Sequence, residues 1–280
     1  MKKLLPVLLL LGLLAGCQGT FSESRIQELE AMQPDERLAA LEGISLEQRS
    51  HPEYRRLWSS AVWDQCEGLS QRERIVAMRD RLREDPENVM LSKLLGDAYF
   101  DFAQGDGGRA YLDSALFAYE NAALKAPDYL PAVGSVGSLY DEKENLDQAI
   151  YWYGRVLEID PDHVPTLCNL GASHYNRGES NQAMDMYRRA LELDPQSQDA
   201  HYNLGVAFAE AQIYREAIRE WETVVSIDPD TPVAVQAAGN AALLRDVLEE
   251  TVYRGGRKVR RSSTKGRQDG KPAGDPARQK

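Results

Sequence analysis

The cysteines and histidines are the side chains of this sequence whose spacing is most informative about nucleophilic or metal chemistry, and there are seven: Cys17, Cys66, Cys168, His51, His163, His174 and His201. Catalysis and metal binding need such groups to converge. Cys168 and His174 fall on one predicted helix, but they lie six residues apart, which separates them by about 240° around the axis. The sequence has no nucleophile elbow, phosphate-binding loop or metal-ligand spacing. We therefore expect no enzymatic activity, no catalytic residue, no metal and no cofactor.

Cys17 differs from the other two cysteines because of what precedes it. Two lysines open the chain, and the apolar run from Leu4 to Leu14 is shorter than the roughly 20 residues that span a bilayer. Such a run suits a secretion signal. It ends in Leu14-Ala15-Gly16-Cys17, where small residues allow entry into a peptidase cleft and the thiol is the group that takes a lipid. These four residues resemble the bacterial lipobox.

The lipobox resemblance implies a location for the protein. It predicts a lipoprotein signal peptide over residues 1–16 and a lipidated Cys17, whose acyl chains, palmitate among them, anchor the chain to a membrane without spanning it. In Gram-negative lipoproteins an aspartate after the cysteine favours the inner membrane, and here that residue is Gln18. The expected location is an outer-membrane anchor facing the periplasm, or the outer face of the single membrane in a Gram-positive source. An ordinary signal peptide with a chance cysteine is the alternative.

The net charge of −11 is unevenly distributed. The segment from Arg254 to Lys280 has ten basic and two acidic residues, whereas residues 17–253 carry a net charge of −21. The acidic body argues against a nucleic-acid partner. The tail has almost no apolar residues, so we expect residues 254–280 to be disordered. Its densest charges are candidates for binding an anionic envelope polymer, or else serve only solubility: Arg257, Lys258, Arg260 and Arg261.

The prolines reveal an internal repeat of 34 residues. This interval separates Pro127, Pro161, Pro195 and Pro229, and Pro86 precedes the first of them by 41 residues, one period plus seven. A glycine lies ten residues after each proline of this series, and an alanine lies twelve residues before four of them: Gly96, Gly137, Gly171, Gly205, Gly239, Ala115, Ala149, Ala183 and Ala217. Such small residues mark where two helices cross closely, and proline separates one helical unit from the next.

These marks resemble those of a known repeat family. The following residues resemble the tetratricopeptide repeat (TPR): Asn169-Leu170-Gly171, Tyr175, Ala183, Tyr187 and Leu191-Glu192-Leu193-Asp194-Pro195, then Asn203-Leu204-Gly205, Phe208, Ala217, Trp221 and Ile227-Asp228-Pro229. The resemblance implies an all-α fold, a right-handed solenoid of helix-turn-helix pairs. It covers four units over residues 86–229, of which the first has a seven-residue insertion near residues 104–109.

The segments that flank these units keep the pattern less well. After a spacer at residues 17–24, residues 25–85 are expected to form N-terminal helices with a degenerate TPR-like unit. Within this region Ser70 and Glu73 predict a capping box at a helix start. Two capping helices, near 231–241 and 243–253, are expected over residues 230–253 to close the end of the stack.

The TPR resemblance also implies a binding groove. The first helix of each pair lies on the concave side of such solenoids, and its groove-facing positions hold amides, aromatic rings and carboxylates: Lys93, Asp97, Phe100, Ser135, Asp141, Asn169, Tyr175, Asn176, Tyr202, Asn203 and Glu210. This lining suits an extended peptide or a partner helix with some basic character. Alternatively, the fold itself favours Asn at positions 169 and 203. TPR domains that clamp a chain-terminal carboxylate add Lys or Arg at slots that here hold Pro131, Pro165, Asp199 and Val233, so we reject that ligand.

The sequence therefore predicts a membrane-anchored TPR scaffold that binds proteins in a bacterial envelope assembly. Pilus and secretin assembly, outer-membrane insertion and cell-wall machinery are the settings in which such lipoproteins are known. The alternative is a structural tether between membrane and cell wall that uses the basic tail.

Overall fold

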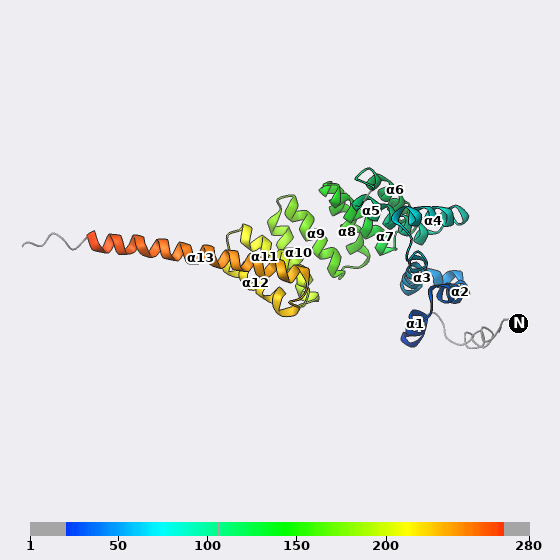
Figure 1. Cartoon of the computed structure of the whole chain (residues 1–280), viewed down its shortest axis with the longest axis horizontal. Coiled ribbons are helices and arrows are strands. Elements are labelled where there is room, and N and C mark those ends of the chain that lie inside the picture. Colours follow the sequence, from blue (N-terminus) through cyan, green and yellow to red (C-terminus); the bar gives the residue numbers. More distant parts are fainter. Residues whose placement is uncertain (1–20, 106, 266–280) are drawn as a thin grey trace, which may run out of the picture. The chain divides into compact units, whose positions relative to one another are not determined.

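A computed structural model describes residues 21–105 and 107–265 of the chain. Within this part every regular element is a helix, which confirms the predicted all-α fold. The chain divides into two compact units, Met1–Ile159 and Asp160–Lys280. In each unit the helices pack mainly against the next helix along the chain (Figure 1). A search of the described helices for one long and apolar enough to span a membrane finds none.

Five helical segments begin the described part of the first unit: α1 (Glu23–Glu30), α2 (Pro34–Glu42), the 3-10 helix η2 (Leu46–Ser50), α3 (Pro52–Asp64) and α4 (Gln71–Glu84). Arg37 joins the first two, because its buried guanidinium donates to the carbonyl oxygens of Leu29 and Glu30 at 3.0 Å and of Met32 at 3.2 Å. The predicted capping box is present at α4, where the Glu73 carboxylate accepts from the Ser70 backbone N–H at 2.8 Å.

Two helix pairs complete the first unit. They are α5 (Val89–Gln104) with α6 (Tyr111–Lys125), and α7 (Leu130–Glu142) with α8 (Leu146–Ile159). The connection between α5 and α6 is longer than that between α7 and α8, and it lies in the region that the sequence assigned to the insertion. The buried core along these pairs consists largely of alanine, leucine, valine and tyrosine side chains.

The second unit contains two further pairs and a final helix. The pairs are α9 (Val164–Asn176) with α10 (Ser180–Leu193), and α11 (Gln198–Glu210) with α12 (Tyr214–Ile227), and α13 (Pro232–Lys265) packs on α12 and α11. Below, α5, α7, α9 and α11 are called the first helices, and α6, α8, α10 and α12 the second helices.

Each pair closes through the same contact, in which a glycine of the first helix lies against an aromatic ring of the second. A Cβ built on the glycine would lie too close to a ring atom in all four pairs: 2.4 Å for Gly96 and Tyr119, 2.8 Å for Gly137 and Tyr153, 2.5 Å for Gly171 and Tyr187, and 2.5 Å for Gly205 and Trp221. The alanines of the repeat, four residues before each ring, are fully buried. The close helix crossings predicted from glycine and alanine are therefore confirmed.

The C-terminal end differs from the sequence prediction. In place of two capping helices and disorder from residue 254, a single helix, α13, runs from Pro232 to Lys265. In three pairs the turn residue has positive φ, namely Glu144 (59°), Gly178 (84°) and Gln212 (62°), each 34 residues after the last. The next position in phase is Asp246, which is helical. It follows an Ala-Leu segment of strong helix formers, so nothing breaks the helix there. Residues 266–280 lie outside the described residues.

Candidate protein-binding surfaces

A hydrogen-bonded network on the first helices joins three of the predicted groove residues in the first unit. On α5, Lys93 Nζ lies 2.7 Å from Asp97 Oδ2, and each side chain is about a fifth exposed. Tyr119 Oη of α6 donates to Asp97 Oδ1 at 2.9 Å. The same hydroxyl interacts with the Ser135 side chain of α7. Lys93, Asp97 and Ser135 are thus linked across three helices through one buried tyrosine.

Burial and nearby charges keep the Tyr119 hydroxyl protonated, and they place two carboxylates, Asp97 and Asp101, close to each other. Burial raises the pKa of Tyr119 far above its usual value, and the Asp97 carboxylate raises it further, so the hydroxyl remains a donor. Burial also raises the pKa of Asp101, one turn beyond Asp97, and the Asp97 charge adds to this rise. Arg74 of α4 and Lys93 oppose it, with Arg74 Nη1 3.8 Å from Asp101 Oδ2. A further cation beside Asp101 would be favourable.

The other two predicted groove residues of the first unit lie differently. Phe100 is partly buried and packs against the hydrophobic core. Asp141 is partly buried on α7, and its charge contributes to raising the pKa of the Tyr153 hydroxyl of α8 to about 12, behind the larger effect of burial. The Tyr153 hydroxyl of α8 donates to Ser138 Oγ of α7 at 3.2 Å, so it is bound to the first helix of the pair. Phe100 is therefore held in the core, whereas Asp141 keeps part of its surface in solvent.

In the second unit the predicted residues fall into two classes. The side chains of Asn169 and Asn176 on α9 are exposed, and Asn203 on α11 is half-buried. Tyr175 and Glu210 come together, because a hydrogen bond to the Glu210 carboxylate adds to burial in raising the pKa of Tyr175. Tyr202 instead belongs to the packing of the last helices: Asn240 of α13 donates to its hydroxyl at 3.3 Å, and its ring centroid is 6.5 Å from that of Trp221.

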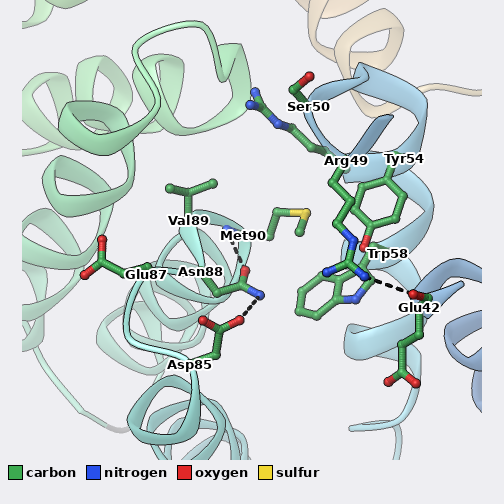
Figure 2. Close-up of a pocket in the computed structure, with 11 residues that line it drawn as sticks. Glu42, Arg49, Ser50, Tyr54, Trp58, Asp85, Glu87, Asn88, Val89 and Met90 are labelled. Atoms are coloured by element: carbon green, nitrogen blue, oxygen red, sulfur yellow. Dashed lines mark hydrogen bonds between the residues drawn. The ribbon is translucent and has the colours of Figure 1, made fainter. Parts of the chain in front are cut away.

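A cleft of about 440 Å³ that the sequence did not predict lies between η2, α3 and the start of α5 (Figure 2). On one side of it, Arg49 donates to the carbonyl oxygens of Glu42 at 2.9 Å and Ile44 at 3.1 Å. Asn88 caps α5 through the backbone N–H groups of Met90 and Leu91, both at 3.1 Å. Arg49 therefore fastens the connection between α2 and η2, and Asn88 fixes the start of α5, so both groups serve local structure on either side of the cleft.

Titratable groups of the second unit also have structural partners. Burial raises the pKa of the Cys168 thiol to about 11, which leaves it protonated and a poor nucleophile at neutral pH. His174 Nδ1 lies 2.6 Å from Glu179 Oε2, and His201 Nδ1 lies 2.7 Å from Glu220 Oε2. Cys66 and Cys168 are both free and buried. Among the described residues no group of three His, Cys, Asp or Glu side chains could hold a metal ion.

The structure does not describe the side chains of two predicted functional segments. Cys17 lies outside the described residues. Arg257, Lys258, Arg260 and Arg261 lie in the C-terminal part of α13, where the helix but not the side chains is described. Sequence reasoning missed Tyr119, the centre of the first-unit network. The sequence pattern could have identified it, because an aromatic residue lies eight positions before each of four repeat prolines: Tyr119, Tyr153, Tyr187 and Trp221.

Comparison with known proteins identifies the same repeat. The profile of a family described as TPR repeat matches residues 137–178 and 173–212. A search of curated proteins gives no significant match. Among solved structures, a MamA structure from Desulfovibrio magneticus RS-1 is 14% identical with a TM-score of 0.53, over 65% of this chain and 97% of that chain. YrrB, a TPR protein described as having an unusual peptide-binding site, is 18% identical with a TM-score of 0.50, over 72% and 96%.

A thermophilic TPR protein from Thermus thermophilus gives the same result, at 17% identity and a TM-score of 0.50, over 59% of this chain and 88% of that chain. The chain therefore contains TPR repeats, and at these identities the likeness to solved structures concerns the fold.

Proposed function

We propose that the chain is a non-enzymatic scaffold, anchored to a bacterial membrane by a lipid on Cys17, whose first helices bind a protein partner in an envelope assembly. The membrane part of the proposal is supported by the sequence from Leu14 to Gln18. The assembly is one of those that build pili and secretins, the outer membrane or the cell wall. The binding part is supported by the side chains of the first helices.

The observation that carries the binding proposal is the group of charged side chains Lys93, Asp97 and Asp101 on α5, which we call the acidic network. Lys93, Asp97 and Asp101 follow one another at intervals of four residues on one helix face. The Tyr119 hydroxyl holds Asp97 in place by a hydrogen bond to its carboxylate. A ligand that meets side chains already held in place loses less conformational entropy on binding. Because Asp101 is crowded by Asp97, a Lys or Arg of the partner would gain by pairing with it. The first unit therefore favours a basic side chain of the ligand.

Exposed amides on α9 complement this in the second unit. Asn169 and Asn176 lie seven residues apart, which places them on the same side of the helix. Within the described part of the chain neither side-chain amide has a hydrogen-bond partner. An amide can donate to one peptide group and accept from another, as an extended peptide requires. The preferred ligand is an extended or helical segment with basic residues.

The test is recovery of partners from detergent-solubilised envelopes with the tagged full chain. Asp97→Asn combined with Asp101→Asn removes the two negative charges and keeps the side-chain shapes. We expect this variant to lose the partners that the parent chain recovers. Asp185→Asn, which changes an exposed carboxylate on the second helix α10, is the matched control and should recover all of them. An unchanged partner list for the double variant would refute binding through α5.

The anchor is tested separately by fractionation. Cys17→Ser should move the chain from the membrane fraction to the soluble envelope fraction, and retention in the membrane would contradict a lipid on Cys17. Deletion of residues 255–280 tests the alternative function of a cell-wall tether. If the deletion releases the chain from the wall while the recovered partners stay the same, the tether replaces the scaffold as the proposed function.

A further inference from the structure

The helix α13 has the packing of a first helix. Gly239 lies 34 residues after Gly205 and so occupies the glycine position of the repeat. On the opposite side of α13, Ala234, Ala237 and Ala241 are buried against α12. Another first helix, α11, also contacts α13. By sequence phase and by contact, α13 therefore begins a further helix pair.

Within the described residues, which end at Lys265 on this side, the pair has no second helix of its own. The turn position, Asp246, is helical, and α13 continues to Lys265 past α11 and α12 instead of turning back (Figure 1). The aromatic residue of each complete pair follows the glycine by 16 or 23 positions, the larger number where the first pair contains its insertion. The residue 16 positions after Gly239 is Gly255. The described part of α13 thus has no turn at this position, and the repeat position of the ring holds a glycine.

The uncovered side of α13 is apolar. Val235 and Leu243 are each 66% exposed, and they lie four residues on either side of Gly239, in one row along the helix. A Cβ built on Gly239 would meet no atom within 4 Å, unlike the four glycines that face rings. A polar outer side is what a capping helix would present. We call Val235, Gly239 and Leu243 the end face.

The complete pairs specify what fits such a face. Each second helix brings a fully buried alanine and, four residues later, the ring that lies on the glycine; in the second unit these are Ala183 with Tyr187 and Ala217 with Trp221. The alanine permits close approach, and the ring fills the space above the glycine. Asp246 is exposed seven residues after Gly239, on the same side of α13, and favours a positive charge on whatever binds.

We infer that the end face docks an amphipathic helix of another protein, which carries a small residue followed four residues later by Tyr or Trp, with a Lys or Arg beside them. The bound helix takes the place of the missing second helix of the last pair. The end face is made by residues of the second unit and the acidic network by residues of the first, so this docking does not depend on the proposed function.

The chain itself offers a probe of this chemistry. A synthetic peptide of residues 212–229 contains the α12 helix with Ala217, Trp221 and nearby arginines. Fluorescence anisotropy of the labelled peptide measures its binding to the full chain. We expect Gly239→Leu, which fills the space for the ring, to weaken binding by at least about tenfold. Ala238→Leu adds similar bulk to the neighbouring exposed position and should change binding by less than about twofold.

Two further variants test whether the peptide binds through its ring and through the apolar side chains of the end face. The peptide with Trp221→Ala should bind the parent chain at least about tenfold more weakly. Leu243→Ser removes an exposed apolar side chain without touching the core, and should also weaken binding. Equal binding by the Gly239→Leu and parent chains would overturn the inference, as would tighter binding by Gly239→Leu. A concentration-dependent dimer of the chain that Gly239→Leu dissociates would assign the end face to a second copy and would also overturn it.

Discussion

Substituting the repeat glycines by alanine should have opposite effects at two positions that the sequence treats as equivalent. Gly205 and Gly239 lie 34 residues apart in helices of the second unit. A Cβ at Gly205 would lie 2.5 Å from Trp221 Nε1 and 2.7 Å from its Cδ1, whereas a Cβ at Gly239 would meet nothing within 4 Å. We predict that Gly205→Ala destabilises the protein and Gly239→Ala stabilises it.

The magnitudes follow from two opposing terms. In a helix interior Ala is more favourable than Gly by about 0.8–1.0 kcal/mol. At Gly239 this is the whole effect, so the free energy of unfolding should rise by about that amount. At Gly205 the indole must move, which adds an overpacking penalty of about 1–3 kcal/mol. It also strains the bond from Trp221 Nε1 to the Tyr202 carbonyl oxygen at 3.1 Å, worth about 1 kcal/mol. The net loss should be about 1–3 kcal/mol.

Urea denaturation of the full chain, followed by circular dichroism, measures both changes. Helix stacks can unfold in more than one step, so the slope of each transition must be compared with that of the parent chain. Gly171→Ala is the control for a covered glycine and should resemble Gly205→Ala, because its Cβ would lie 2.5 Å from the Tyr187 ring. If Gly205→Ala and Gly239→Ala shift the transition in the same direction by similar amounts, the assignment of Gly239 as an uncovered position is wrong.

Three further predictions concern other contacts. Arg37→Ala removes the donor to three carbonyl oxygens, one in a buried and two in partly buried hydrogen bonds, and should lower the free energy of unfolding by about 3 kcal/mol. The exposed Arg56→Ala should lower it by less than about 1 kcal/mol, and equal losses would refute this role. Tyr119→Phe removes the donor to Asp97 and should lower the free energy of unfolding by about 0.5–1.5 kcal/mol, with no change if the bond is absent in solution. His201 has a raised pKa because of its hydrogen bond to a carboxylate on α12, so its stabilisation is complete below about pH 6.5 and is lost as pH rises through the raised value. His201→Gln should therefore flatten the pH dependence of Tm above pH 6.5, and an unchanged profile would contradict it.

The helix pairs could be predicted from the sequence because three kinds of residue act locally and recur in phase. Proline ends one unit, and glycine and alanine fix where two helices cross; the four Gly–aromatic contacts confirm the crossings. The end of the stack was predicted wrongly for the same reason. Gly239 keeps the phase, but the turn depends on whether Asp246 leaves the helix, and no glycine or proline forces it to do so. The position of a residue in the 34-residue repeat is therefore not enough to predict a turn there.

The groove could be predicted as a set of positions, but not as a set of interactions. Lys93 and Asp97 are four residues apart and would be neighbours on the surface of any helix. Tyr119 reaches Asp97 from α6 only because Gly96 lets its ring approach. Likewise, Tyr202 occupies a groove position by spacing, yet its hydroxyl is used by Asn240 of α13. Contacts between helices depend on crossing geometry and on which residues the next helix brings. Those quantities are set by packing rather than by the repeat pattern.

The contact that builds the stack also explains why its end remains open. Each first helix contributes a glycine and each second helix a ring, so an array that stops after a first helix leaves one glycine uncovered. A polar side on α13 would make that end inert, but Val235 and Leu243 make it apolar. A helix that docks there would repeat a contact the chain already makes four times, while the acidic network lies on another unit. Variants of Asp97 should therefore leave peptide binding at Gly239 unchanged, and variants of Gly239 should leave the envelope partners of α5 unchanged.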